Sequence, residues 1–458
     1  MTLDVSQLLL AADLSPQEVE VVLAPYGFLN PHEIDRLLQR MCPDTTSRFA
    51  LAAHLDNVLM AASQSANPEV CLLQLDRLAE SYGQRSTLYH RLGADPQTLN
   101  TFFSLASCSR VLSDVLVLNP EYVSILADSQ MLTVPRKLDD LRLEASGLTR
   151  IFHEKEAALG ALRRMRRREY LRIGARELTG IGSLQEIVGE ISDLACAIVG
   201  ETLSVCYEYQ DYPGEEKPPS FAVVAFGKLG AGELNYSSDI DLAIVWETPP
   251  GEESEDISRF YSRLAKSLVD ALANNSPDGR LYRVDLRLRP FGNAGPIGTS
   301  VTQFLNYYET YSEPWERQAL LKARTIAGPP ALRARLDDFI QRFIYARTMD
   351  PFSIAQILEV KNRSEEFRSR GGQMDRQVKH GWGGIRDVEF TVQLLQLVAG
   401  YQNPEVRTPA TLDALEALRT LGVLSSQEQK ALESAYIFLR QVEHRLQLAE
   451  ELPMQTIP

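Results

Sequence analysis

Two aspartates one residue apart are the first candidates for chemistry in this sequence. Asp239 and Asp241 follow a glycine-rich segment and lead into an apolar run, residues 242–246. Alternate side chains of a strand share a face, so both carboxylates are expected on one face. Their Cα atoms would be roughly 6–7 Å apart at ~3.3 Å per residue. Burying two carboxylates costs free energy unless a partner offsets the cost. A divalent cation such as Mg²⁺, which takes oxygen ligands and is often shared with substrate phosphates, fits this pair.

A third carboxylate lies in residues 281–290, LYRVDLRLRP. Apolar and polar residues alternate there, which predicts a strand with one apolar face. Its polar face would carry Asp285 among Arg283, Arg287 and Arg289. Such a face can supply ligands for two metal ions together with phosphate contacts, because guanidinium groups bind phosphate oxygens in pairs. A solvated strand edge with chance acidic residues is the alternative, and the glycine segment together with the Asp/Arg strand favours the site.

These carboxylates need strands and a loop to position them. Residues 221–226 and 242–246 are short apolar runs joined by a segment rich in Gly, Asn and Ser, and this pattern predicts strand, loop, strand. Within the loop, Gly227, Ser237 and Ser238 are candidates for a phosphate cradle built from backbone N–H groups and hydroxyls.

Basic residues near these strands are candidates for binding phosphate or nucleotide. Lys228, Arg287 and Arg289 are expected to hold an incoming phosphate. A helix is predicted to start after Pro314, and it would place a second basic set, for which salt bridging on a helix surface is an equally weighted alternative. This second set is Arg317, Lys322 and Arg324.

Composition narrows the class of protein. The chain has 458 residues, 44% hydrophobic and 24% charged, which indicates a folded protein of two or three domains. Its formal net charge of −14 argues against a nucleic-acid partner, whose binding surface should be basic. Five scattered cysteines without a CxxC pair argue against zinc and disulfides and favour the cytoplasm. No apolar run is long enough to predict a membrane span, and no signal peptide is expected.

Three regions are expected along the chain. Residues 1–200 should be a helical region, residues 201–330 a catalytic core, and residues 331–458 a second helical region. The fold class is therefore α+β, with a strand-containing core flanked by helices; the resemblance described below implies that this core is a small mixed sheet. Basic residues at 163–168 indicate either a salt-bridged helix face or a surface for phosphate or an acidic protein. Arg386 and Glu389 share a helix face, for which a buried ion pair between helices is favoured over an anion site at the preceding glycines.

Four long segments carry a resemblance to a known family. GKLGAGELNYSSDIDL, RVDLRLRPFG, PWERQALLKAR and GWGGIRDVEF resemble the bacterial glutamine synthetase adenylyltransferase/adenylyl-removing enzymes. That family belongs to the polymerase-β-like nucleotidyltransferases. The wider superfamily usually has Gly-Gly or Gly-Ser before the carboxylates, whereas this chain has Gly227-Lys228. The resemblance covers nearly the whole chain but only the front half of the family's longer protein, so the chain is expected to be part of a two-half protein.

The resemblance implies a reaction and partners. The family's front half removes AMP from a tyrosine of glutamine synthetase by phosphorolysis, which yields ADP, and its rear half attaches AMP from ATP. Asp239, Asp241 and Asp285 are then expected to be catalytic and to bind two Mg²⁺ ions. The nitrogen-regulatory PII protein is an implied partner.

Three other functions remain open at this point. The chain could adenylylate glutamine synthetase with ATP, since the two halves have similar motifs. It could be a PII- or glutamine synthetase-binding module without catalysis, against which the intact carboxylates weigh. A nucleotidyltransferase acting on nucleic acid is disfavoured by the acidic charge.

Overall fold

The computed structural model describes residues 4–11, 14–213, 220–248, 254–346, 348–369 and 376–450. The chain has the expected α+β class, and it divides into two compact units. The first comprises residues 1–135, 167–183 and 448–451, and the second comprises 136–166, 184–447 and 452–458. The division expected from the sequence, at 200 and 330, stays a prediction. No helix within the described ranges is both long and apolar enough to cross a membrane.

The first unit is helical throughout its described residues. Short polar segments end one helix and cap the next: Asn67 accepts a hydrogen bond from the N–H of Val70, and Asp95 accepts one from Gln97. A proline follows each cap, where its missing N–H costs nothing. The helices are α1 Gln7–Leu10, α2 Pro16–Leu23, α3 Pro31–Met41, α4 Thr45–Ala52, α5 Leu55–Ser63, α6 Pro68–Tyr82, α7 Arg85–Gly93, α8 Pro96–Cys108, α9 Arg110–Leu118, α10 Val123–Leu126 and α11 Ser129–Thr133.

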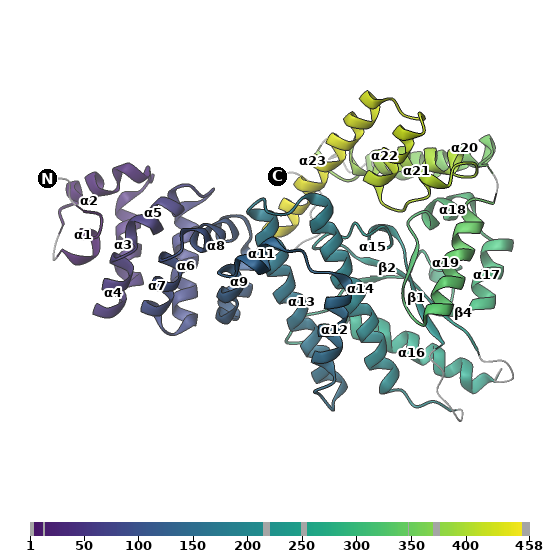
Figure 1. Cartoon of the computed structure of the whole chain (residues 1–458), viewed down its shortest axis with the longest axis horizontal. Coiled ribbons are helices and arrows are strands. Elements are labelled where there is room, and N and C mark those ends of the chain that lie inside the picture. Colours follow the sequence, from purple (N-terminus) through teal and green to yellow (C-terminus); the bar gives the residue numbers. More distant parts are fainter. Residues whose placement is uncertain are drawn as a thin grey trace. The chain divides into compact units, whose positions relative to one another are not determined.

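The second unit contains the sheet and most of the remaining helices (Figure 1). The strands are β1 Phe221–Ala225, β2 Ile240–Trp246, β3 Val284–Asp285, β4 Gly298–Ser300 and β5 Arg324–Ala327. The helices are α12 Leu138–Thr149, α14 Leu184–Glu208, α15 Gly227–Ala231, α16 Glu255–Ala273, α17 Val301–Thr310, α18 Pro314–Leu320, α19 Pro330–Ile344, α20 Pro351–Ser369, α21 Ile385–Ala399, α22 Thr411–Thr420 and α23 Ser426–Glu450, and α13 Lys155–Leu178 continues from this unit into the first.

The sheet is mixed, with strand order β3-β2-β1-β5 and with β4 also paired to β2. β1 is antiparallel to β2 and β5, whereas β3 and β4 are parallel to β2. Ala243 and Val245 of β2 face a core that includes Phe304 of α17 and Leu336 of α19. Asp241 shares that face because alternate residues of a strand point the same way. The sheet therefore ends, on this face, in a carboxylate.

Three local expectations need correction. The strand expected over 281–290 is only two residues long, because β3 pairs only with the start of β2 and residues 287–290 turn away. The segment between β1 and β2 is not a plain loop, since α15 forms within it. The helix starting at Pro314 ends at Leu320, and Arg324 lies in β5, a strand that the sequence analysis missed.

Candidate functional site

Asp241 and Asp285 lie opposite each other on neighbouring parallel strands. The register pairs Ile240 with Val284 and Asp241 with Asp285, so both carboxylates lie at the same edge of the sheet. Ile240 is completely buried, as expected for a residue pointing into the core. The structure thus brings together two carboxylates that are distant in sequence.

Burial and repulsion disturb the ionisation of this pair. Burial raises the pKa of Asp241 to about 6, and the neighbouring charge of Asp285 adds to the increase. Burial of Asp285 acts in the same direction, but hydrogen bonds from Arg287 outweigh it, and the pKa of Asp285 is lowered. Two carboxylates with different pKa values therefore share one site. The more buried one, Asp241, has a pKa of about 6, and that of Asp285 is lowered.

Asp239, the third carboxylate, lies just before β2 and is half exposed. Its Oδ1 accepts a hydrogen bond from Nε of Arg283 at 2.5 Å, and the same guanidinium donates to the backbone carbonyl of Ser237. Arg283 precedes β3, so it ties the start of β2 to its neighbour. This contact fixes the segment that carries Asp239 beside the other two carboxylates.

Gly227 is packed directly against Asp241. Its φ is +55°, and a Cβ at this position would lie 2.7 Å from Oδ2 of Asp241. Phe226, the residue before it, donates its backbone N–H to the carbonyl of Asp241 at 2.9 Å. Only glycine leaves room here for the carboxylate and also favours the left-handed backbone. Of the other cradle candidates, Ser237 is buried and donates its backbone N–H to Gln447, and Ser238 is partly buried.

The carboxylates fit a divalent cation as a pair. Within the described ranges, no group of three or more His, Cys, Asp and Glu side chains has the spacing to hold a metal ion. Asp241 and Asp285 are nevertheless two hard oxygen donors whose mutual repulsion a bound cation would relieve. Asp239 is the third candidate ligand, and Arg283 now holds it. We conclude that the donor set fits Mg²⁺, through Asp241 and Asp285 first.

The two arginines expected to hold phosphate are placed differently. Arg287 turns back onto Asp285 with three side-chain hydrogen bonds between 2.5 and 3.0 Å, and its side chain is 71% exposed. Arg289 instead donates to the backbone carbonyls of Leu286, Gly295 and Pro296, so it braces the turn after β3. Arg287 lies at the carboxylates, whereas Arg289 holds the turn that follows β3.

Lys228 is held by a carboxylate of α23. Its Nζ lies 2.9 Å from both oxygens of Glu443, which is buried. Burial alone would raise the pKa of Glu443, but the charge of Lys228 outweighs it and lowers the value to about 2. Arg440, one turn earlier in α23, donates to the carbonyl of Glu233 and to Asn235. The last turns of α23 in this unit thus hold the segment between β1 and β2.

The second basic set lies in the protein interior. Lys322 contacts Glu233 at 2.9 Å and Glu389 at 2.7 Å, a buried ion pair that joins α21 to the core. Arg317 is buried and donates to the carbonyl of Ile344, and Arg324 donates to that of Leu229. These contacts lie within the protein rather than on a helix surface, and binding of nucleotide or phosphate by this set stays a prediction.

The structure shows partners for Arg386 and Glu389, and for two arginines of the basic run at 163–168. Glu389 pairs with Lys322 rather than with Arg386, whose guanidinium lies over the ring of Phe390. Arg163 is buried and bonded to Glu156, and Arg164 pairs with Asp278. Salt bridges therefore account for these two arginines.

Lys379 lies near the candidate site, and the sequence analysis did not single it out. Its charge lowers the pKa of Asp241 and also that of Glu443, so it lies near both carboxylates. It belongs to the segment before α21, which runs through glycines that end at Gly384. A single lysine in a polar segment carries no periodicity, so the sequence alone gave no signal for its place.

Fold and site together define an α+β protein whose mixed sheet ends in carboxylates lined by basic side chains. Residues 99–338 match the family model described as glutamate-ammonia ligase adenylyltransferase, and residues 352–458 match the one described as GlnD PII-uridylyltransferase. The first match covers more than half of the chain, and it includes all three carboxylates. The chain belongs to the glutamate-ammonia ligase adenylyltransferase family.

Curated relatives of this chain are named bifunctional glutamine synthetase adenylyltransferase/adenylyl-removing enzyme. The protein from Shewanella loihica is 32% identical over 79% of this chain and 38% of the relative. One from Rhodopseudomonas palustris is 31% identical over 89% of this chain and 43% of the relative, and one from Shewanella oneidensis is 33% identical over 83% and 40%. The chain thus spans less than half the length of these relatives.

Proposed function

We propose that this chain removes AMP from a modified tyrosine of glutamine synthetase by phosphorolysis. The observation that carries the proposal is the in-register pair Asp241 and Asp285, with Asp239 and Arg287 beside it. The direction of the reaction rests on RVDLRLRPFG and PWER, which resemble the front half of the family. The relatives' printed name includes both adenylylation and its reversal, so adenylylation with ATP is the second candidate.

The reaction brings two anions together. An oxygen of inorganic phosphate bonds to the phosphorus of the AMP group, the bond from that phosphorus to the tyrosine oxygen breaks, and ADP and a phenolate result. The phenolate then takes a proton, for which a free tyrosine has a pKa near ~10. The main requirement is neutralisation of charge, which preorganised cations supply in the transition state.

Each side chain of the site has a part in this scheme. Asp241, Asp285 and Asp239 would hold Mg²⁺, in our proposal two ions, which when bound stabilise the attacking and leaving oxygens. Arg287 is exposed enough to contact the incoming phosphate. Gly227 keeps the approach to Asp241 open. Arg289 and Lys228 support these residues, because Arg289 is bonded to carbonyls of the turn after β3 and Lys228 is paired with Glu443.

The partners follow from the same reasoning. We propose glutamine synthetase as the protein substrate and PII as a regulator, the latter because residues 352–458 match a PII-uridylyltransferase model. The net charge of −14 favours a protein substrate over nucleic acid. A cytoplasmic location fits the five cysteine thiols, all of them free.

One incubation tests this proposal. AMP-modified glutamine synthetase is mixed with the chain, Mg²⁺ and phosphate, and ADP is measured. Phosphate-dependent ADP release is the expected result, and it should disappear with Asp241→Asn. Transfer of AMP from ATP to unmodified glutamine synthetase, without ADP release from the modified form, would instead establish the adenylylating reaction. Silence of the folded chain in both assays, with PII present, would refute catalysis by this chain.

A further inference from the structure

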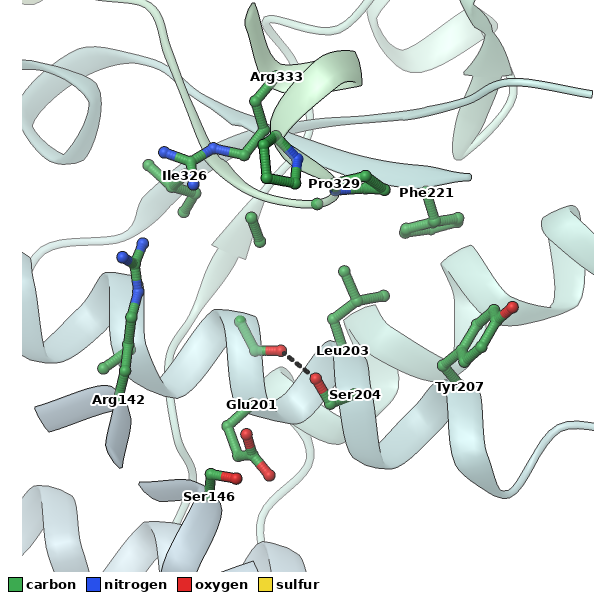
Figure 2. A pocket seen from close by; sticks show the side chains of 15 residues that line it. Arg142, Ser146, Glu201, Leu203, Ser204, Tyr207, Phe221, Ile326, Pro329 and Arg333 are labelled. Atoms are coloured by element: carbon green, nitrogen blue, oxygen red, sulfur yellow. Dashed lines mark hydrogen bonds between the residues drawn. The ribbon is translucent and has the colours of Figure 1, made fainter. Parts of the chain in front are cut away.

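A pocket lies in the sheet-containing unit, apart from the carboxylates, and no part of the proposed reaction uses it. It has a volume of about 660 Å³ and lies among α12, α14, β1, β5 and the start of α19 (Figure 2). Residues that define its character are Arg142, Glu201, Leu203, Phe221, Ile326 and Arg333. This volume is in the usual range for small-molecule sites.

The sheet separates this pocket from the carboxylates. Phe221 begins β1 and pairs with Trp246, whereas Ala225 ends β1 and pairs with Leu242, next to Asp241. Four residues of strand span about 13 Å at ~3.3 Å each. The pocket therefore lies at the far end of β1, and it is not an extension of the acidic site.

The middle of the pocket is apolar. Leu203, Phe221 and Ile326 line it and are each at most 8% exposed. Pro329 adds a rigid apolar wall on the side of α19. Figure 2 shows these side chains around a common space. An apolar body of a ligand would bury its surface here with little rearrangement.

Positive charge gathers on one side of the pocket. The guanidinium groups of Arg142 and Arg333 extend toward the same side in Figure 2. The Nε atom of Arg333 is buried and has no hydrogen-bond partner among the described residues. Among the described residues, Arg142 makes one ion pair, a 3.3 Å contact with Asp139, which is 91% exposed, so this pair is weak; its charge also acts on Asp193. Both arginines thus have capacity for an anion.

Two further features add to this positive side. α19 begins at the pocket, and its N-cap residue, Pro329, makes no side-chain cap hydrogen bond, so the positive end of the helix dipole adds to this side. Burial raises the pKa of the Cys196 thiol to about 11; Arg324, Arg142 and Arg333 lower it, and the charge of Asp193 raises it. Three arginine charges and one opposing carboxylate therefore act on this point of α14.

The opposite wall limits how much negative charge a ligand can carry. Glu201 lies there and accepts a hydrogen bond from the hydroxyl of Thr149. Its carboxylate would repel a second anionic group. Ser146 lies beside Glu201 in Figure 2 and offers a further hydrogen bond. The walls therefore suit a ligand with one anionic end, an apolar body and a polar far end.

We propose that this pocket binds a small organic monoanion, a carboxylate with an aliphatic or aromatic body. The carboxylate accepts hydrogen bonds from Arg142 and Arg333, and the body packs on Leu203 and Phe221. Binding at this site is separate from the proposed transfer of AMP and does not depend on it.

Ligand-observed NMR on the full chain tests the proposal. The probes are benzoate, 4-hydroxyphenylacetate and hexanoate, each compared with its own primary amide. Because a guanidinium–carboxylate contact is strong only with the charged form, at least one acid should bind about tenfold more tightly than its amide. Equal binding of acid and amide, or no binding by any of the three acids, would overturn the proposal.

Matched variants locate the bound acid. Arg333→Met should weaken its binding about tenfold, whereas Arg335→Met on the same helix, where Arg335 pairs with Glu247, should not. Gly200→Leu should abolish binding, because Gly200 lines the pocket and a Cβ there would just touch the side chain of Ala327 at 4.0 Å, so the rest of the leucine would fill the pocket. Gly189→Leu, also in α14 but away from the pocket, is its control. Binding that survives both Arg333→Met and Gly200→Leu would place the acid elsewhere and refute this site.

Discussion

Two groups of basic side chains in the sheet-containing unit show opposite relations to solvent. Arg287 at the carboxylates is 71% exposed, and among the described residues its ion pair is with Asp285. Lys228 and Lys322 are at most 12% exposed, and buried carboxylates of α21, α23 and the core surround them. The exposed group can exchange its partner for a substrate, whereas exchange in the buried group would leave a carboxylate uncompensated. The same residue types therefore lie at the surface in one place, where we propose that they bind substrate, and hold the interior together in the other.

The largest effect is expected from the acidic pair itself. Asp241→Asn removes one charged ligand while keeping the shape of the side chain, so ADP release should fall by at least about 10³-fold. Circular dichroism and Tm should stay close to native, because Asp241 gains nothing from burial as a charge. Asp256→Asn, an exposed position in α16, is the control and should keep its activity. Substantial turnover by Asp241→Asn would break the assignment of this pair to catalysis.

The buried group should instead govern stability. Glu443→Ala leaves Lys228 without its carboxylate, and loss of one partner of a buried pair costs about 3–5 kcal/mol in the free energy of unfolding. Urea unfolding measures this loss, and Gln441→Ala, an exposed position in α23, is the control. A fully stable Glu443→Ala chain with reduced ADP release would show that this group belongs to the chemistry after all.

Two arginines sharpen the comparison. Arg287→Met should raise the KM for phosphate about 10- to 100-fold, because one charge-assisted contact to the substrate is lost. Arg317→Met should leave that KM unchanged and lower Tm, because Arg317 donates to the carbonyl of Ile344 in the interior. Phosphate-dependent kinetics beside thermal unfolding separate the two. An unchanged KM in Arg287→Met would move phosphate binding to another residue.

The sequence predicted where the carboxylates lie better than where the buried basic side chains lie, for a physical reason. Alternation within β2 is a local property, so it placed Asp241 opposite the buried Ile240 and Leu242. Local alternation also misled, since it extended β3 across a segment that Arg289 folds into a turn. The partner of Lys228 lies 215 residues away in Glu443.

No pattern near a lysine reports such a distant carboxylate. The sequence therefore offers Lys228 as a phosphate ligand and Lys322 as either a phosphate ligand or part of a helix-surface salt bridge, and it does not show their buried carboxylate partners. Lys379 could not be predicted, because its segment lacks periodicity. The fold nevertheless brings its charge near Asp241. Long-range pairing of charges is set by tertiary packing, and only the structure shows it.

The smallest expected effect is a shift in the ionisation of Asp241. In metal-free buffer, carbon NMR of labelled aspartate should show this carboxyl titrating near pH 6, since burial raises its pKa and the charge of Asp285 adds to the increase. Asp285→Asn removes a repelling charge and should lower the pKa, whereas Lys379→Met removes an attracting one and should raise it. Because the folded pKa lies above the unfolded value of 3.8, this group favours folding most at low pH, and that contribution is lost as pH rises through about 6. If the titration responds to Asp285→Asn but not to Lys379→Met, the charge of Lys379 does not act on Asp241. Lys379 would then belong with the structural lysines, Lys228 and Lys322.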